Sequence, residues 1–325
     1  GKDKGTPIAA ENASVAVAEN VPGFDIVFCG HDHRRANRRI VNTAGDSVWV
    51  LNPAAQAHAI AKADFTITLN GQKVVSKKVE GSLVDIDHLT PDADFMKTFA
   101  TQFEQGKKFT NDLVGKSQNT MESVPAFFGP SAFIDFIHQM QLQIGKAEVS
   151  FAAPLAMDAV IPEGNIYVRD MFNLYRYENL LYVMNLTGQE IKDYLEFSYG
   201  GWVKQMENKD DHMLLFHDNP EQYADTWQRF QRPSYNFDSA AGIRYTVDLT
   251  KPTGQRITIL SMADGQPFSL TRTYRCALNS YRGNGGGGLL TQGAHIPENE
   301  LTKRIVWSMN DYEPCCSTPL YDAMG

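Results

Sequence analysis

Segments with strand patterns alternate with capped amphipathic helices along most of this chain, and this alternation constrains its fold more than any other feature. The clearest helix is TGQEIKDYLEFS, where Thr187 stands at the N-cap and Glu190 follows three residues later. That spacing is typical of a capping box, in which each side chain bonds the backbone amide of the other residue. A strand is expected just before it, near Tyr182. This part of the chain is therefore predicted to mix α and β structure.

Two more helices and a set of strands are predicted from periodicity and turn signals. In the segment 90–106, Thr90 is a candidate cap and Pro91 occupies the first helical position, while 131–144 has the pattern of a second amphipathic helix. Strands are predicted at 24–29, 47–52, 64–69, 72–79, 147–155, 243–249, 256–262 and 273–279. The predicted fold class is α+β.

The distribution of these elements predicts three parts. Residues 1–87 read as a β-rich edge without an obvious complete core, 88–115 as a connecting helix, and 116–325 as a mixed α/β domain. A chain of 325 residues is long enough for two domains.

Charge and hydropathy exclude some classes of partner. A net charge of −8 argues against sequence-independent binding to the nucleic-acid backbone, because such binding requires a basic protein face that releases counterions. The run RRANRR at 34–39 is therefore interpreted as a solvated strand edge. No apolar run approaches the roughly 20 residues of a membrane span, and no signal peptide is recognisable in this chain. The expected partner is a small molecule, with neither a nucleic-acid polymer nor a membrane span involved.

Two histidines one residue apart, His31 and His33, follow the first predicted strand in the segment CGHDH. Imidazole nitrogens are ligands for zinc, manganese and iron, and a hydrolytic site with two metal ions needs several such ligands. A pair of solvated turn histidines is the simpler interpretation of an isolated His-x-His. From the residues alone both interpretations stay open.

Two other segments could contribute to a small-molecule site. Tyr175, Tyr177 and Tyr182 lie near a strand, either as a stacking platform for a base or as half-buried sheet residues. The run GNGGGG at 283–288 follows a strand, Tyr281 and an arginine. Glycine runs are common in mobile loops, but glycine is also the residue that lets a ligand approach the backbone closely.

Five collinear blocks carry a more specific pattern, at 29–33, 128–155, 168–196, 235–257 and 274–288. Together they resemble the bifunctional 2′,3′-cyclic-nucleotide 2′-phosphodiesterase/3′-nucleotidase branch of the 5′-nucleotidase superfamily. Members of this family have a calcineurin-like α/β metallophosphoesterase sandwich with two metal ions, followed by a C-terminal domain that binds the nucleoside. The resemblance implies that 1–87 is a truncated remnant of that sandwich, that 88–115 contains a hinge, and that 116–325 is the 5′-nucleotidase C-terminal domain.

The resemblance also implies roles for individual residues. His31 and His33 would be ligands of two divalent metal ions, zinc, manganese or similar. The earlier metal motifs of the family have no counterpart here, so the chain is expected to be a C-terminal fragment that binds these ions partly or not at all and does not hydrolyse substrate alone. Tyr177 and Tyr281 match the aromatic pair that sandwiches the base. The expected substrate-binding residues are Tyr177, Asn179, Tyr281, Arg282, Gly285, Gly286 and Gly287.

Two departures bear on the branch. Gly287 stands where the 5′-nucleotidase branch has an aspartate that binds ribose. That branch also has a Gly-rich motif containing an arginine, and residues 151–165 of this chain lack this motif. Both favour the cyclic phosphodiesterase branch, whose members are usually exported to the periplasm or cell surface. A 5′-nucleotidase or sugar-nucleotide hydrolase is the enzymatic alternative, and a non-catalytic nucleoside-binding module is the alternative of another class. The tail after Trp307 supports no functional prediction.

Overall fold

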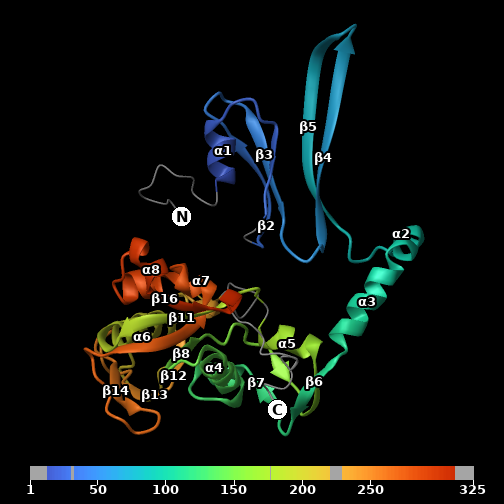
Figure 1. The fold of residues 1–325 in the computed structure, drawn as a ribbon. Coiled ribbons are helices and arrows are strands. Elements are labelled where there is room, and N and C mark those ends of the chain that lie inside the picture. Colours follow the sequence, from blue (N-terminus) through green and yellow to red (C-terminus); the bar gives the residue numbers. More distant parts are fainter. Residues whose placement is uncertain (1–12, 31–32, 176, 220–228, 312–325) are drawn as a thin grey trace. The chain divides into compact units, whose positions relative to one another are not determined.

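The computed structural model describes residues 13–30, 33–175, 177–219 and 229–311 of the chain. It divides into two units, residues 1–100 and 101–325, each with its own elements and its own core (Figure 1). The predicted boundaries of the connecting segment, 88–115, enclose this division. The three-part organisation and the hinge stay predictions.

The first unit contains a small sheet, one helix packed on it and a long ribbon. The sheet has the strand order β1-β3-β2, with β1 parallel and β2 antiparallel to β3. Its core is small, since the buried cluster among the described residues consists of Ala18, Val48 and Val50. The elements are α1 (Ser14–Asn20), β1 (Ile26–Phe28), β2 (Arg35–Val41), β3 (Ser47–Pro53), β4 (Ala59–Asn70), β5 (Lys73–Asp85) and α2 (Ala93–Thr98).

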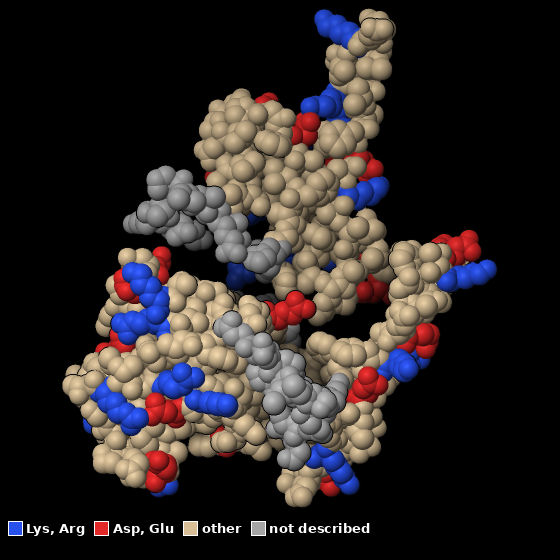
Figure 2. Space-filling view, viewed as in Figure 1, with Lys and Arg blue, Asp and Glu red and all other residues tan. Residues whose placement is uncertain are grey.

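Strands β4 and β5 pair along their whole length as a two-stranded antiparallel ribbon, turning at the predicted Asn70–Gly71. Apolar and polar residues alternate along β4, which is typical of a strand with one covered face. Within the described residues, however, the side chains of Phe65, Ile67 and Leu69 are about half exposed (49%, 51% and 58%). In Figure 2 uncharged side chains cover the upper part of this ribbon below its tip, while charged side chains lie at the tip and lower down. The ribbon therefore presents an apolar row to solvent.

The predicted helix at 90–106 is two helices in the structure, and its predicted cap is wrong. Asp92 caps α2, because its carboxylate accepts a hydrogen bond from the backbone N–H of Phe95 (2.8 Å). The aspartate, a better cap than Thr90, moves the helix start two residues downstream of Pro91. After a break at Phe99 the chain continues as α3 (Ala100–Thr110).

The second unit is built on a five-stranded mixed sheet with the order β12-β8-β15-β11-β16. Strands β8 and β15 are parallel, and the other neighbours are antiparallel. The sheet strands are β8 (Val149–Ala152), β11 (Leu181–Thr187), β12 (Ser239–Ala241), β15 (Thr273–Asn279) and β16 (Ile305–Ser308). The other described strands of this unit form three two-stranded pairs, β6 (Leu113–Ser117) with β10 (Gly164–Tyr167), β7 (Met121–Glu122) with β9 (Val160–Ile161), and β13 (Ile243–Val247) with β14 (Ile257–Met262).

Helices cover both faces of this sheet. On β8, Ser150 faces α4 and bonds His138, whereas Phe151 faces α6 and packs on Tyr194 with ring centroids 4.2 Å apart. Since neighbouring residues of a strand point to opposite faces, α4 and α6 lie on opposite sides. The helices of this unit, with its single-turn elements, are η1 (Val124–Phe127), α4 (Ala132–Gly145), α5 (Val168–Leu174), α6 (Gly188–Trp202), η4 (Ser234–Asn236), α7 (Ser280–Gly283), η5 (Gly286–Gly288), η6 (Leu289–Gly293), α8 (Glu298–Arg304) and η7 (Met309–Asp311).

The capping box predicted for α6 is confirmed. The Thr187 hydroxyl accepts from the Glu190 backbone N–H (3.2 Å), and the Thr187 backbone N–H donates to the Glu190 carboxylate (2.7 Å). The α+β fold class is confirmed as well, with the expected mixed sheet in the second unit. None of the described helices is long and apolar enough to cross a membrane.

Candidate functional site

Strand register brings two distant segments of the second unit together. The first residue of β11, Leu181, pairs with the last residue of β15, Asn279. The segment before β11 therefore lies beside the segment after β15, and Leu180 and Ser280 bond each other twice, through Ser280 N–H to the Leu180 carbonyl (2.7 Å) and Leu180 N–H to the Ser280 hydroxyl (3.1 Å). This arrangement places the two predicted aromatic positions on adjoining segments, Tyr177 before β11 and Tyr281 in α7.

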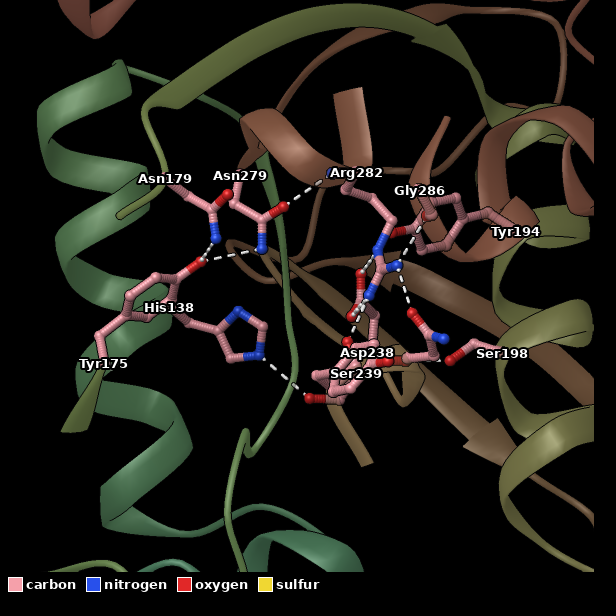
Figure 3. A network of polar contacts seen from close by, with 12 residues as sticks. His138, Tyr175, Asn179, Tyr194, Ser198, Asp238, Ser239, Asn279, Arg282 and Gly286 are labelled. Atoms are coloured by element: carbon pink, nitrogen blue, oxygen red, sulfur yellow. Dashed lines mark hydrogen bonds and ion pairs between the residues drawn. The ribbon is translucent and has the colours of Figure 1, made fainter. Parts of the chain in front are cut away.

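A buried guanidinium, that of Arg282, holds this region together (Figure 3). The Arg282 side chain is 1% exposed and forms a bidentate ion pair with Asp238, through Nε (2.9 Å) and Nη2 (2.8 Å). The remaining donors reach the Asn236 side-chain oxygen (2.9 Å), the Gly286 carbonyl (2.8 Å) and the Tyr235 carbonyl (2.7 Å). All five N–H donors of the guanidinium are thus used within the protein.

The carboxylate of Asp238 is anchored from α6 as well. The Tyr194 hydroxyl donates to this carboxylate, and the Ser198 hydroxyl donates to the Asp238 carbonyl (2.7 Å). Burial alone would lower the pKa of Arg282, but the Asp238 charge more than offsets burial and raises it. The guanidinium of Arg282 therefore stays charged throughout the physiological pH range. Its contacts and those of Asp238 tie α6, η4 and α7 to one point.

Three tyrosines are partly exposed at the rim of this network. The exposed fractions of Tyr177, Tyr235 and Tyr281 are 45%, 37% and 41%. The Tyr235 ring lies next to both others, with centroids 6.1 Å from Tyr177 and 6.2 Å from Tyr281 and interplanar angles of 71° and 79°. These three side chains, here called the tyrosine trio, form an aromatic surface open to solvent.

The glycine run beside the trio has both conformational and steric reasons for its composition. Gly285 and Gly287 adopt φ angles of +96° and +73°, which residues with a side chain rarely adopt. A Cβ on Gly286 would lie 2.5 Å from the Tyr281 ring, and one on Gly287 would lie 2.3 Å from the Asn236 side-chain oxygen. The run is thus packed against the trio and the Arg282 network rather than extending freely into solvent.

The predicted polar contact Asn179 belongs to a second small network (Figure 3). Its amide donates to the Tyr175 hydroxyl (3.3 Å), which also accepts from the Asn279 amide (2.9 Å). The Asn279 side-chain oxygen in turn caps α7 by accepting from the Arg282 backbone N–H (2.8 Å). Burial raises the pKa of Tyr175, so this hydroxyl stays protonated.

A buried histidine on α4, His138, bonds residues from two strands behind this region (Figure 3). Its Nδ1 lies 3.0 Å from the Ser150 hydroxyl and its Nε2 lies 3.1 Å from the Ser239 hydroxyl. Because the Ser150 hydroxyl donates its only proton to Gln141 (3.1 Å), it must accept from the histidine, which fixes the proton on Nδ1. Burial lowers the pKa of His138 to about 4, so the ring is neutral at physiological pH.

The two predicted metal ligands belong to the first unit. His31 lies outside the described residues, and His33 is exposed with a φ of +57°. Among the residues that the structure describes, no group of three or more His, Cys, Asp or Glu side chains could hold a metal ion. The described residues do not by themselves fit a two-metal centre.

Tyr235, Asn236 and Asp238 form part of the site without having been predicted to do so. They fall in the block 235–257 that carries the family resemblance, but the sequence assigned them no role. One local signal was available, because Asp238 is an acidic residue in YNFDSAAGI, an otherwise uncharged stretch. A carboxylate in such a stretch is a candidate for burial, and burial requires a cationic partner.

The second unit is thus a mixed α/β domain whose central sheet carries an aromatic and glycine-rich rim. Comparison with known proteins gives the family. Residues 113–293, more than half of the chain, match the family described as 5′-nucleotidase, C-terminal domain, and the chain belongs to that family. The predicted family is thereby confirmed.

Among curated proteins, the chain is 34% identical over 323 residues to a trifunctional nucleotide phosphoesterase of Bacillus subtilis, covering 86% of this chain and 21% of that protein. It is 26% identical to a 2′,3′-cyclic-nucleotide 2′-phosphodiesterase/3′-nucleotidase of Haemophilus influenzae, covering 88% of this chain and 49% of that protein. The chain thus spans between about a fifth and a half of the length of these relatives.

A solved structure supports the fold. A 5′-nucleotidase from Staphylococcus aureus superposes with a TM-score of 0.64 at 22% identity, covering 87% of this chain and 50% of that one. At this level of identity the similarity establishes a common fold and nothing finer.

Proposed function

We propose that the second unit recognises the nucleoside part of a nucleotide, within a protein that hydrolyses nucleotide phosphoesters. The substrate class we infer is the 2′,3′-cyclic nucleotide, which would open to a 3′-phosphate that the same protein removes. Membership of the 5′-nucleotidase C-terminal domain family and the activities for which the relatives are named support this proposal.

The observation that carries the proposal is the tyrosine trio. Tyr177 and Tyr281 stand on adjoining segments that strand register holds side by side, and each keeps more than two fifths of its surface exposed. Stacking of a base on an aromatic ring contributes about 1–3 kcal/mol and tolerates different bases. Broad use of nucleobases is therefore expected.

The other predicted contacts differ in how freely they could reach a ligand. We assign the glycines 285–287 to the close approach of the sugar, because they are partly exposed beside Tyr281. Asn179 is partly buried and would offer its remaining amide proton and its oxygen. Arg282 has no donor left for a substrate, so we assign it a positioning role beneath the loop. Its predicted direct contact with the substrate stays a prediction.

The second enzymatic candidate, a 5′-nucleotidase, is less well supported at Gly287. An aspartate at this position would put its Cβ 2.3 Å from Asn236 and 2.4 Å from the Arg282 guanidinium, at a φ of +73°. The loop as it is packed here leaves no room for the ribose-binding aspartate of that branch. This favours the cyclic phosphodiesterase branch.

We assign hydrolysis to the whole nucleotide-hydrolysing protein proposed above, and not to the described residues alone. His31 and His33 are proposed ligands of two divalent ions, zinc, manganese or similar, and the other ligands would come from outside the described part of this chain. Export to the periplasm or cell surface is likewise a proposal that rests on the family resemblance.

Calorimetric titration of the chain with adenosine, 3′-AMP and 5′-AMP tests the proposal. Adenosine and 3′-AMP should bind, and binding should be lost in the Tyr177→Ala/Tyr281→Ala double variant. Phe128→Ala, which removes another exposed aromatic side chain of the same unit (57% exposed), is the matched control and should bind normally. Absence of nucleoside binding to the unchanged chain would refute the proposal, and binding of 5′-AMP alone would favour the 5′-nucleotidase.

A further inference from the structure

The central ring of the tyrosine trio, Tyr235, has a geometry that the two stacking roles do not explain. It contacts Tyr177 and Tyr281 at nearly equal centroid distances, 6.1 and 6.2 Å, and is steeply inclined to both. Rings stacked in one column would instead be near parallel. Tyr235 therefore forms a separate wall of the aromatic surface.

The inclination decides which part of a ligand this wall can meet. A base stacked on Tyr177 or on Tyr281 lies parallel to that ring, so its plane is tilted by about 71° or 79° from the Tyr235 ring. At such an angle the two flat systems cannot stack face to face. Tyr235 would meet the rim of the base, where the ring nitrogens and exocyclic groups are.

The position of Tyr235 is fixed from its backbone. Its carbonyl accepts from Arg282 Nη2 (2.7 Å), and the next residue, Asn236, accepts from Arg282 Nη1 (2.9 Å). On the other side, the Ser234 hydroxyl donates to the Leu155 carbonyl (3.3 Å). Because three consecutive residues are tied to buried partners, the wall is in place before a ligand arrives.

We propose that Tyr235 reads the rim of the bound base and sets the preference of this site between purines and pyrimidines. The proposal rests on the proposed function, since it requires a base stacked on Tyr177 or Tyr281. When a purine and a pyrimidine are stacked in the same position, their outer edges extend to different distances from the stacking ring. A wall at the rim must therefore act differently on the two classes, whereas a stacking ring acts on both.

The chemistry of the side chain suits this role. An aromatic face attracts the positive C–H and N–H edge of another ring, at a gain of about 0.5–1.5 kcal/mol. Burial and the neighbouring Tyr281 and Tyr177 raise the pKa of Tyr235, so its hydroxyl stays protonated and can donate to a base nitrogen or carbonyl.

The test compares dissociation constants of adenosine and cytidine for the full chain and three variants, Tyr235→Ala, Tyr235→Phe and Tyr177→Ala. Tyr235→Ala should change the ratio of the two constants by roughly 3- to 10-fold. Tyr177→Ala should weaken both nucleosides and leave the ratio within about twofold. Tyr235→Phe keeps the ring and should keep most of the preference. Phe128→Ala is the control for removal of an unrelated exposed aromatic side chain.

The two proposals fail in distinguishable ways. If Tyr177→Ala weakens binding but Tyr235→Ala leaves the adenosine-to-cytidine ratio unchanged, Tyr235 is not a rim reader and the proposed function stands. If the unchanged chain binds neither nucleoside, both are overturned. Circular dichroism of each folded variant separates a change in preference from a loss of structure.

Discussion

A guanidinium with every donor occupied behaves differently from a surface arginine. Arg282 is buried, it faces Asp238, and its other hydrogen bonds join Tyr235, Asn236 and Gly286. Removing one partner of a buried ion pair leaves the other charge uncompensated, which costs more than the pair itself contributes. The stability of the second unit should therefore depend strongly on this residue.

Arg282→Lys should lower the free energy of unfolding of the second unit by about 3 kcal/mol, because lysine keeps the charge but lacks the planar fork of donors. Lys303→Ala breaks an exposed pair with Glu300 in the same unit and should cost about 1 kcal/mol or less. Urea denaturation followed by tryptophan fluorescence measures both. Equal small losses would contradict the structural role of Arg282.

His138 predicts a pH dependence of stability. Its folded pKa of about 4 lies below the ordinary value of 6.5, because burial disfavours the charged ring. Between these two values the unfolded chain binds more protons, so the free energy of unfolding falls as the pH falls, by about 3 kcal/mol at most. Unfolding of His138→Gln at pH 4.5 and 7 should lack this contribution. His295→Asn, at an exposed histidine of the same unit, should keep it; an unchanged slope in His138→Gln would exclude His138 as its source.

At the scale of elements, the glycine run has two requirements that can be tested separately, a positive φ angle and the absence of a Cβ where neighbouring atoms pack closely. Gly287 and Gly265 both adopt positive φ angles, +73° and +88°, but only Gly287 has atoms within reach of an added Cβ. Gly265→Asp should cost only the backbone strain, about 1–2 kcal/mol. Gly287→Asp should cost more and weaken nucleoside binding as well. Thermal unfolding and adenosine titration of the two variants test this, and equal effects would mean that the close packing around Gly287 is unimportant.

Elements with local signals were predictable from the sequence. The helix α6 carries both halves of its capping box within four residues, and α4 (Ala132–Gly145) lies within one residue of the predicted helix 131–144. The start of α2 was misplaced, since Thr90, Pro91 and Asp92 offer competing signals and only the hydrogen bond to Phe95 decides between them.

The residues of the site also differ in whether the sequence alone could predict them. Tyr177 and Tyr281 were predicted because the family resemblance matches them one by one, although their roles stay predictions. Tyr235 and Asp238 escaped prediction because their contacts join residues about 45 positions apart, as in the pair of Asp238 and Arg282 (|i−j| = 44). Burial and pairing at that separation are properties of the folded sheet and leave no periodic pattern in the sequence.

At the scale of the whole molecule, the two units have separate and unequal cores. Among the residues that the structure describes, the first unit has a cluster of three buried residues, whereas the second has three larger clusters that include the sheet and both covering helices. Buried apolar area is the main source of stability, so the units should differ in their resistance to heat. The first unit is expected to unfold at the lower temperature.

Differential scanning calorimetry should therefore show two transitions. Adenosine at a hundred times its dissociation constant should stabilise the second unit by about 2.7 kcal/mol and leave the first transition in place, because a ligand stabilises only the cooperative unit that binds it. Arg282→Lys should lower only the upper transition. A single transition that shifts as a whole would show that the two units unfold cooperatively.

The pairing of Leu181 with Asn279 has a consequence for how such a site varies among organisms. Since this register holds the two outer tyrosines together, insertions and deletions in the long stretch between the strands can accumulate without moving one tyrosine from the other. The central tyrosine lies within that stretch and is held by Arg282 instead. During evolution the number of residues between the three segments can therefore change while the aromatic surface keeps its shape. Relatives with this site are best sought as three short segments of variable spacing rather than as one continuous motif.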